Sequence, residues 1–322
     1  MYSRQILYGL AAAHPETDFL YCYRPHRFLR SFRESIVKNA HRRLLLKNRS
    51  ISARLFHGLN QRIDSTRHRC TVSTFHDLFV LSGDYSSPEF RQKFAQQARE
   101  AAERSNLIIA VSKFTARQVQ ELLNVEPARI RVIPHGVRRP AIVPGRREQL
   151  ILFVGAIQRR KNVTRLIEAF ESVPRGWKLV LAGSLGYGAQ EALDRIANSA
   201  RKGDIEVLGY VPDERLDDLY ARASLVAFPS LDEGFGMPVL DAMAHGVPVL
   251  TSNVSALPEV SGDAALLVDP LDVSSIANGL SRLTADESLR AHYAQSGLQR
   301  SLEFSWERAV EATWKVYQEL PS

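Results

Sequence analysis

Acidic residues and glycines gather where an apolar run gives way to a helical pattern in the second half of the chain. A strand is expected to end near Ser230 and a helix to begin near Met237, with Pro238 in its first turn, where the missing N–H of proline costs little. The loop between them contains Asp232, Glu233, Gly234 and Gly236. Glycines let the backbone approach a ligand closely, and the N-terminal end of a helix attracts anions. The backbone N–H groups of residues 234–237 are therefore predicted to face a diphosphate.

Two carboxylates of this segment, Glu233 and Asp241, lie eight residues apart. A carboxylate next to a phosphate would repel it, so sugar hydroxyls are the expected partners. One carboxylate accepts two hydroxyl hydrogen bonds at once, which suits a ribose diol or a hexose. The alternative is structural: an acid that favours the helix dipole and a second, solvated acid on the helix.

Three consecutive cations, Arg159, Arg160 and Lys161, follow the apolar run at 150–156 and start the next helical pattern. Cations at a helix N-terminus oppose the dipole, so we expect an anion to neutralise them. A diphosphate leaving group would supply this charge as its bond to a sugar breaks. A surface basic cluster is the alternative.

The second half alternates regularly between short apolar runs and helical patterns. The runs lie at 150–156, 177–184, 205–211, 224–230, 247–252 and 264–269, and the helical patterns at 161–173, 190–200, 213–223 and 237–246. Short runs rich in Val, Ile and Leu are typical of strands buried on both faces, with helices as crossovers. We predict an α/β domain with a doubly wound parallel sheet.

The first half shows a looser form of the same alternation. Candidate strands lie at 18–23, 71–77, 107–112 and 130–136, and helical patterns at 2–13, 88–104 and 113–124. Residues 137–149 contain Pro140, Pro144 and Gly145 without an apolar period, which indicates a linker. The predicted domains are 1–140 and 150–303, and ligands of such sheets bind at the carboxyl ends of the strands.

Positive charge is concentrated in one segment of the first half. The chain of 322 residues has a net charge of +7, yet residues 24–54 alone contain ten Lys or Arg and one acid, Glu34. Apolar residues such as Leu29 and Phe32 are interleaved with them. Such a segment can lie on an anionic membrane surface or hold a phosphorylated acceptor, and a solvated helix with a core-facing stripe is an equal alternative. Nucleic acid is disfavoured because no aromatic stacking platform accompanies the charge.

The cysteines and the hydropathy predict a cellular compartment. Cys22 and Cys70 have neither metal-ligand spacing nor a disulfide framework, and we expect both to be reduced and buried. No apolar run reaches the ~18 residues of a membrane span, and no signal peptide precedes the first helical pattern. We expect a cytoplasmic protein, peripheral at the inner membrane face if the basic segment binds lipid.

Several long motifs together resemble glycosyltransferase family 4, the retaining enzymes of the GT-B fold. They are FVGAIQRRKN, LGYVPDERLDDLYARASLVAFPS, EGFGMPVLDAMAHGVPVLTSNVSALPEV and GDAALLVDP. The resemblance runs from about residue 57 to the C-terminus. It implies two Rossmann-like domains facing a cleft, and a nucleotide diphosphate sugar bound mainly to the second, without a metal or other cofactor. Residues 304–322 resemble the GT-B terminal helix that completes the first domain.

The resemblance also implies roles for single residues of the second domain. It places Lys161, with Arg160 beside it, on the diphosphate, Glu233 on the donor sugar and Asp241 on the ribose. The family usually has glutamate at this last position, and the shorter aspartate implies a looser contact. The remaining implied donor contacts are Gly155, Tyr210, Val211, Gly234, Phe235, Gly236 and Met237.

In the first domain the segment STFHDLF resembles the His-Asp segment of the family. His76 would lie by the donor sugar or the acceptor and is, with Glu233, the candidate catalytic residue. The segment LFHGLNQR offers His57 and Asn60 as acceptor-side candidates.

Members of the family carry a strand and a glycine-rich loop before the helix that residues 2–13 resemble. Their absence would deprive the first sheet of its central strand. A mis-assigned start codon and a truncated protein with impaired catalysis are the two hypotheses, and the DNA just upstream decides between them.

The resulting prediction is a retaining, metal-independent glycosyltransferase. It would move a hexose, mannose-type, from a nucleotide diphosphate sugar to a saccharide or lipid-linked acceptor in cell-surface glycan synthesis. The alternatives are a non-catalytic nucleotide-sugar-binding protein and a GT-B sugar-nucleotide epimerase or phosphorylase. The nucleotide base and the acceptor stay open, because base contacts are largely made by the backbone and a fold does not determine a substrate.

Overall fold

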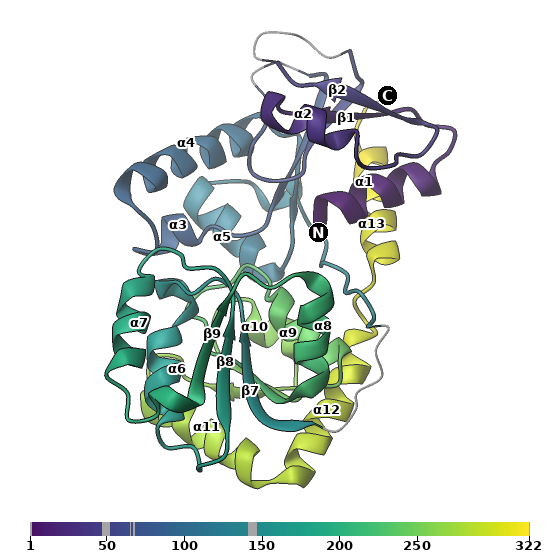
Figure 1. Cartoon of the computed structure of the whole chain (residues 1–322). Helices are drawn as coiled ribbons and strands as arrows, with labels where there is room; N and C mark the ends of the chain where they lie inside the picture. Colours follow the sequence, from purple (N-terminus) through teal and green to yellow (C-terminus); the bar gives the residue numbers. More distant parts are fainter. Residues whose placement is uncertain (1, 47–51, 65, 67, 141–146, 322) are drawn as a thin grey trace. The chain divides into compact units, whose positions relative to one another are not determined.

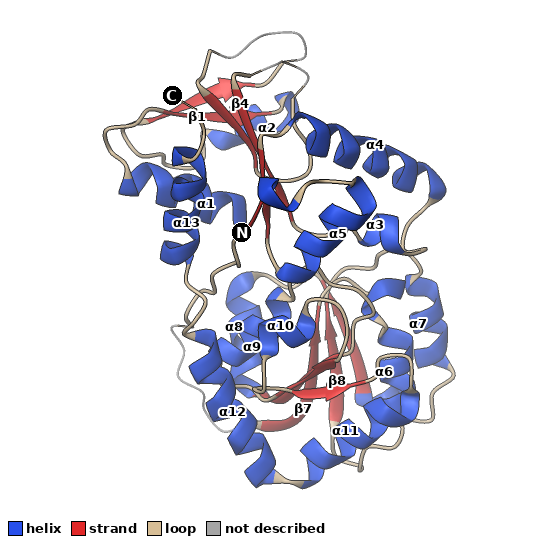
Figure 2. Ribbon diagram, turned by 180° about the vertical axis from the view of Figure 1, so that it is seen from behind, coloured by secondary structure: helices blue, strands red, loops and turns tan. Residues whose placement is uncertain are grey.

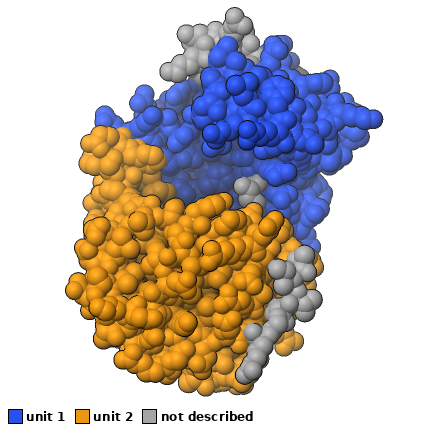
Figure 3. All heavy atoms as spheres, in the orientation of Figure 1, with its two compact units in different colours: residues 1–78, 92–136, 305–322 blue, residues 79–91, 137–304 orange. Residues whose placement is uncertain are grey.

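The structure of the chain is a computed structural model that describes residues 2–46, 52–64, 66, 68–140 and 147–321. It divides into two compact units (Figure 3). Unit 1 comprises residues 1–78, 92–136 and 305–322, and unit 2 comprises residues 79–91 and 137–304.

Unit 2 is built on a parallel sheet with the strand order β12-β11-β10-β7-β8-β9. Its strands are β7 (Glu148–Val154), β8 (Lys178–Ala182), β9 (Ile205–Gly209), β10 (Ala223–Phe228), β11 (Val249–Ser252) and β12 (Leu266–Val268). Every residue of β10 and β11 is buried, as expected for a central strand covered on both faces. The predicted parallel α/β architecture of the second half is confirmed.

Helices cover both faces of this sheet (Figures 1 and 2). On one face lie α6 (Val163–Phe170), α7 (Ala189–Ala197) and α11 (Val273–Ala285), and on the other α8 (Asp213–Arg222), α9 (Met237–Ala244), α10 (Leu257–Ser261) and α12 (Glu287–Ser301). Short helical turns are α3 (Phe79–Ser82), η2 (Arg159–Lys161) and η3 (Lys202–Asp204). The core of unit 2 is the apolar layer on each side of β7, β8 and β10.

Unit 1 has two parallel sheets that share no strand among the described residues, β1-β2 and β3-β4-β5-β6. The strands are β1 (Phe19–Tyr23), β2 (Ala40–Leu44), β3 (Leu55–Gly58), β4 (Cys70–Phe75), β5 (Leu107–Ala110) and β6 (Ile130–Val132). The helices are α1 (Tyr2–Ala13), α2 (Pro25–Ser31), α4 (Pro88–Arg104, from residue 92 on), α5 (Lys113–Leu123), η1 (Pro127–Arg129) and α13 (Trp306–Gln318). The C-terminal helix α13 packs against α1, and Gly9 permits the approach because an added Cβ would lie 2.5 Å from Val310 Cγ2.

The alternative that residues 24–54 form one solvated helix is wrong. Among residues 24–46 and 52–54, only α2 is helical, and β2 follows it and pairs in parallel with β1. The Arg42 side chain fastens this turn, since its Nε donates to the Ser31 carbonyl at 3.2 Å. The strand escaped prediction because His41, Arg42 and Arg43 interrupt any apolar run. Residues 47–51 lie outside the described residues.

The predicted linker and the predicted burial of the cysteines need adjustment. Residues 141–146 lie outside the described residues, and β7 begins at Glu148, inside the range assigned to the linker.

Cys70 is buried as expected, whereas Cys22 is only partly buried because it lies on the small β1-β2 sheet. Burial nevertheless raises the pKa of the Cys22 thiol to about 11, so this thiol stays protonated at neutral pH.

A close backbone approach joins the ends of β7 and β8. Val154 pairs with Ala182, and Gly155 N–H donates to the Ala182 carbonyl at 2.9 Å. A Cβ added to Gly183 would lie 1.9 Å from the Gly155 carbonyl oxygen. Glycine at 183 is therefore required to keep the two loops that follow these strands together.

We expect Gly183→Ala to lower the free energy of unfolding by about 1–3 kcal/mol, because the two strand ends must separate. The measurement is urea unfolding followed by circular dichroism. Gly203→Ala is the matched control, since its added Cβ would meet no heavy atom within 4 Å. Equal midpoints for the two variants would contradict the packing argument.

Candidate functional site

The loops that follow β7 and β10 leave the sheet of unit 2 at its switch point. The two strands are neighbours, and the chain continues from β7 to β8 and β9 on one side and from β10 to β11 and β12 on the other. Open parallel sheets bind ligands outside the carboxyl ends of the strands at such a point. The candidate residues at 155–161 and 230–237 lie on these two loops.

Glu233 forms buried ion pairs with Arg160 and Lys161. Its Oε2 lies 2.9 Å from Arg160 Nη1, and Lys161 Nζ donates to its Oε1. The three side chains are only 8–10% exposed. Removing one partner of a buried ion pair leaves a charge without compensation, so the three side chains form one structural unit.

The Glu233 carboxylate is ionised at neutral pH. Burial by itself raises its pKa, but the charges of Lys161 and Arg160 outweigh burial and hold the pKa below its usual value. Glu233 thus supplies part of the negative charge that was expected beside Arg160 and Lys161. The third cation, Arg159, forms an ion pair with Glu191. Arg160, Lys161 and Glu233 together carry one net positive charge, and the carboxyl of Asp232 lies close to all three.

The three cations do not start the helix as predicted. The cations form the turn η2, and α6 begins only at Val163. Asn162, which lies between η2 and α6, adopts a left-handed conformation with a φ of 60° and so separates the two. The Asn162 side-chain amide donates to the carbonyls of Pro229 (2.9 Å) and Pro270 (2.7 Å). These bonds fasten η2 to the end of β10.

The loop after β10 is hydrogen-bonded to η2 along its length. Leu231 N–H donates to the Arg160 carbonyl at 2.8 Å, and Ser230 Oγ donates to Glu233 Oε1 at 2.7 Å. Glu233 N–H in turn donates to Ser255 Oγ at 3.2 Å. The ion pairs with Arg160 and Lys161 and the hydrogen bonds with Ser230 and Ser255 therefore fix the position of Glu233 without a ligand.

Asp232 is a second buried acid beside Glu233. Its Oδ2 accepts a hydrogen bond from Ser82 Oγ at 2.6 Å, whereas its buried Oδ1 has no hydrogen-bond partner among the described residues. Burial raises the pKa of this carboxyl, and neither the bond from Ser82 nor the charge of Arg160 cancels the effect. Arg160 also lies 4.3 Å above the centre of the Phe79 ring, so residues 79–91 pack directly on this site.

The helix α9 begins at Met237, as predicted, and Gly236 precedes it with a φ of 109°. A Cβ at Gly236 would lie 2.7 Å from Leu257 Cδ2, so this position needs glycine for both its conformation and its space. The buried ring of Phe235 packs edge-to-face on Phe304 with centroids 5.9 Å apart. The loop 234–237 is thus positioned by packing at the carboxyl end of β10.

Asp241 lies in a different electrostatic environment from Glu233. The pKa of its carboxyl is raised to about 7, mainly by burial and also by Asp217 and Asp213, against the opposing charge of Arg138. Asp217 itself binds Arg138 at 2.6 Å. The two acids that the spacing singled out therefore differ in charge near neutral pH: Glu233 is ionised and Asp241 is about half protonated.

The remaining donor-side candidates lie at the ends of β7 and β9. Gly155 has a φ of 147°, and a Cβ there would lie 3.8 Å from Lys161 Cε, so its lack of a side chain leaves space beside the lysine. Tyr210 is 78% exposed just after β9, whereas Val211 is buried. Gly209, the last residue of β9, has a φ of 67°, which turns the chain at this edge.

In unit 1, His76 lies in a cluster of aromatic rings. Its Nε2 lies 2.9 Å from the Leu59 carbonyl and therefore donates, and its Nδ1 lies 3.3 Å from His135 Nε2. The Tyr2 ring packs edge-to-face on it at 4.6 Å. Burial lowers the pKa of His76, so the ring is neutral at neutral pH and has both nitrogens engaged.

The acceptor-side candidates His57 and Asn60 also make contacts within unit 1. His57 Nδ1 lies 2.6 Å from Tyr317 Oη, and its Nε2 lies 2.8 Å from Thr74 Oγ1. Burial lowers the pKa of His57 to about 3. Asn60 is exposed, and its Oδ1 accepts from Arg62 N–H at 2.9 Å. An acceptor contact of His57 would have to replace one of its two hydrogen bonds.

Two serines that donate hydrogen bonds to the candidate acids, Ser230 and Ser82, were not predicted as part of the site. Ser230 could have been found, because it closes a predicted strand three residues before Glu233. Ser82 carries no local signal, since its bond to Asp232 spans 150 residues. Among the described residues, no group of three or more His, Cys, Asp or Glu could hold a metal ion.

Comparison with known proteins assigns both parts of the chain to glycosyltransferases. The family described as "Glycosyl transferases group 1" matches residues 139–300, and the family described as "Glycosyltransferase Family 4" matches residues 14–139. One relative is the O-antigen chain mannosyltransferase B of Escherichia coli, which is 33% identical over 282 residues. The alignment covers 82% of this chain and 74% of that protein.

Solved structures resemble the fold over most of the chain. WaaG, a glycosyltransferase involved in lipopolysaccharide biosynthesis, aligns with a TM-score of 0.72 at 16% identity, over 97% of this chain and 93% of that chain. HepE of Anabaena, solved with UDP and glucose, aligns with a TM-score of 0.68 at 19% identity, over 78% and 72%. These likenesses confirm the GT-B fold. With parallel sheets in both units and matches to both families, the chain belongs to glycosyltransferase family 4.

Proposed function

We propose that the chain transfers a mannose-type hexose, with retention and without a metal, from a nucleotide diphosphate sugar to a saccharide or lipid-linked acceptor in cell-surface glycan synthesis. The observation that carries this proposal is the buried unit of Arg160, Lys161 and Glu233 at the switch point of the unit 2 sheet. The name of the mannosyltransferase relative supports the hexose, and the UDP and glucose bound to HepE support the donor class.

In this proposal the cations hold the diphosphate and the acids hold the sugars. Arg160 and Lys161 neutralise the charge that develops on the leaving diphosphate, helped by the backbone of residues 234–237. Glu233, ionised and already oriented by Ser230, accepts hydrogen bonds from the donor sugar hydroxyls. Asp241 takes the ribose, and the backbone near Tyr210 and Val211 takes the base.

The reaction follows a front-face route. The acceptor hydroxyl attacks the anomeric carbon on the face from which the diphosphate leaves, so the configuration is retained. The bond from the anomeric carbon to the diphosphate oxygen breaks, and the acceptor proton passes to that oxygen. We assign His76 to the donor sugar or acceptor and His57 with Asn60 to the acceptor side. The neutral His76 ring neither adds nor removes charge, and it would exchange its contact with Leu59 or His135 for a hydrogen bond to a hydroxyl.

We expect Lys161→Ala to lower turnover by about 10²–10³, the usual loss for one group that stabilises developing negative charge. The assay follows release of nucleoside diphosphate from GDP-mannose, UDP-glucose or dTDP-glucose in the presence of an acceptor. Lys202→Ala, at an exposed lysine of unit 2, is the matched control. Melting curves check that the variant is folded. Near-normal turnover of a folded Lys161→Ala protein would refute the phosphate role.

Donor binding should strengthen as pH rises from 6 to 8. The pKa of Asp241 is about 7, and only its ionised form accepts hydrogen bonds from both ribose hydroxyls. The two phosphodiester groups of the donor do not titrate in this range, so we expect the dissociation constant to fall about tenfold. Calorimetric titrations at each pH measure it, and Asp241→Asn should remove the dependence. The same slope in Asp241→Asn would rule out this role.

We assign the face around α2 to the surface of an anionic membrane. Leu29 and Phe32 are 81% and 61% exposed there, and Arg24, Arg27, Arg30 and Arg33 flank them. Exposed apolar side chains among cations suit insertion at the headgroup level of anionic lipid. Within the described residues no helix is long and apolar enough to cross a bilayer.

Sedimentation with phosphatidylglycerol vesicles tests this face, with phosphatidylcholine vesicles for comparison. The double variant Leu29→Asp and Phe32→Asp should lose at least about tenfold in vesicle affinity, because both apolar contacts are removed. Leu271→Asp is the control, since Leu271 is 67% exposed on unit 2. Equal sedimentation of both variants, or equal binding to neutral vesicles, would exclude the assignment.

A further inference from the structure

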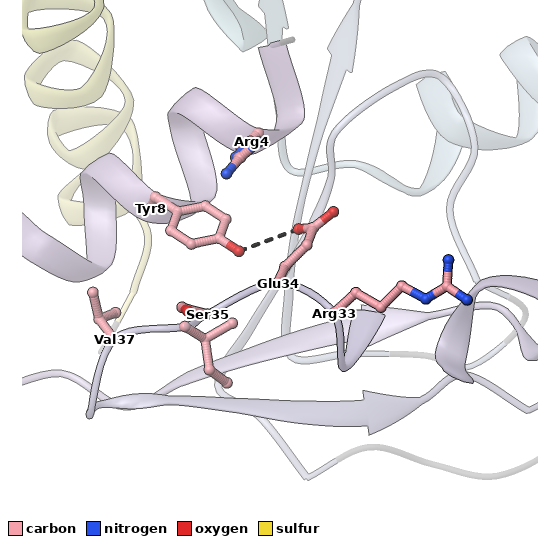
Figure 4. A pocket seen from close by; sticks show the side chains of 7 residues that line it. Arg4, Tyr8, Arg33, Glu34, Ser35 and Val37 are labelled. Carbon is pink, nitrogen blue, oxygen red and sulfur yellow. Dashed lines mark hydrogen bonds between the residues drawn. The ribbon is translucent and has the colours of Figure 1, made fainter. Parts of the chain in front are cut away.

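A pocket of about 630 Å³ opens on unit 1, and none of the residues assigned above to the donor or the acceptor lines it (Figure 4). Arg4 and Tyr8 of α1 form one wall, and the turn of residues 33–37 between α2 and β2 forms the other. Its volume lies in the range of small-molecule sites, roughly 300–1,000 Å³.

The charges on the pocket favour an anion. Arg4 and Arg33 both line it and are exposed, and among the described residues neither forms an ion pair. Glu34 is the one acid of the lining, and its Oε2 already accepts a hydrogen bond from Tyr8 Oη at 3.2 Å. Guanidinium groups bind phosphate oxygens through paired N–H donors, which makes a phosphate the best-matched anion.

The rest of the lining suits a sugar. The Tyr8 ring offers a flat apolar face, and Ile36 and Val37 continue it with aliphatic side chains. Glu34 accepts and Ser35 both donates and accepts hydrogen bonds, as sugar hydroxyls require. Arg4 lies 5.6 Å above the centre of the Tyr8 ring, so the cation and the apolar face are adjacent. A purely electrostatic anion site would need neither the ring nor the carboxylate.

We propose that this pocket binds a phosphate-bearing saccharide, with Arg4 and Arg33 on the phosphate and Tyr8 and Glu34 on the sugar. Given the proposed function, on which this inference rests, the ligand is the acceptor, and its phosphate connects the sugar to a lipid. Phe32 precedes Arg33 in the chain and is 61% exposed, so it offers an apolar side chain to the lipid end of such an acceptor.

Calorimetric titration of the full chain with α-mannose 1-phosphate tests the proposal. The Lys161→Ala protein is titrated in parallel, so that binding to the phosphate-binding loops of unit 2 is not mistaken for binding here. Arg4→Ala should weaken binding on the order of tenfold or more in either background, because a charged hydrogen-bonding partner is removed. Arg117→Ala is the matched control, an exposed arginine of unit 1 that neither lines the pocket nor belongs to the basic segment.

Two comparison probes separate the parts of the site. Methyl α-mannoside, which lacks the phosphate, and inorganic phosphate, which lacks the sugar, should each bind at least about tenfold more weakly than α-mannose 1-phosphate. Tyr8→Phe removes the bond to Glu34 and should reduce the difference between α-mannose 1-phosphate and inorganic phosphate.

Three results would overturn the proposal. They are equal binding of inorganic phosphate, unchanged binding by Arg4→Ala, and loss of binding in Lys161→Ala but not in Arg4→Ala. The proposed function is tested separately by binding of GDP-mannose to Arg4→Ala, which should equal that of the unaltered chain. Failure of that donor binding in every variant, with mannose 1-phosphate still bound, would refute the proposed function and leave the pocket assignment standing.

Discussion

The ion pairs of Glu233 with Arg160 and Lys161 join the loops that follow β7 and β10 in unit 2. Three charges that are about nine-tenths buried must stay together, because each alone would carry a large desolvation cost. The loops after β7 and β10 therefore lie against each other. The hydrogen bonds that Asn162 and Ser230 donate add to this contact. A donor diphosphate would enter a site whose cations are already positioned, so little reorganisation would accompany binding.

The two units use different chemistry for their polar interiors. Unit 2 buries the ion pairs of Glu233, whereas unit 1 holds the rings of His57 and His76, whose nitrogens contact hydroxyls, the Leu59 carbonyl and His135. Burial is the largest cause of the lowered pKa values of His57, His76 and His135, and the charge of His76 lowers those of His57 and His135 further. This division suits the proposed roles, since a charged site holds a diphosphate and a neutral one holds hydroxyl groups.

Much of unit 2 could be predicted from the sequence because its strands are apolar runs buried on both faces. The start of α9 at Met237 was predictable for a local reason, the glycine with positive φ and the proline on either side of it. Where the pattern is mixed, prediction failed. The strand β2 is rich in arginine and histidine, and η2 replaces the first helical turn because Asn162 takes a left-handed conformation, which composition does not reveal.

The sequence by itself determined the fold class, the family and the segments that carry the chemistry, since periodicity and motif spacing are local properties of the chain. Only the tertiary structure decided the state of each group. The ionisation of Glu233, the half-protonation of Asp241 and the contact of Ser82 with Asp232 depend on neighbours far away in the chain. Electrostatic and hydrogen-bond energies depend on distance and burial in space, and neither is encoded in the spacing of residues along the chain.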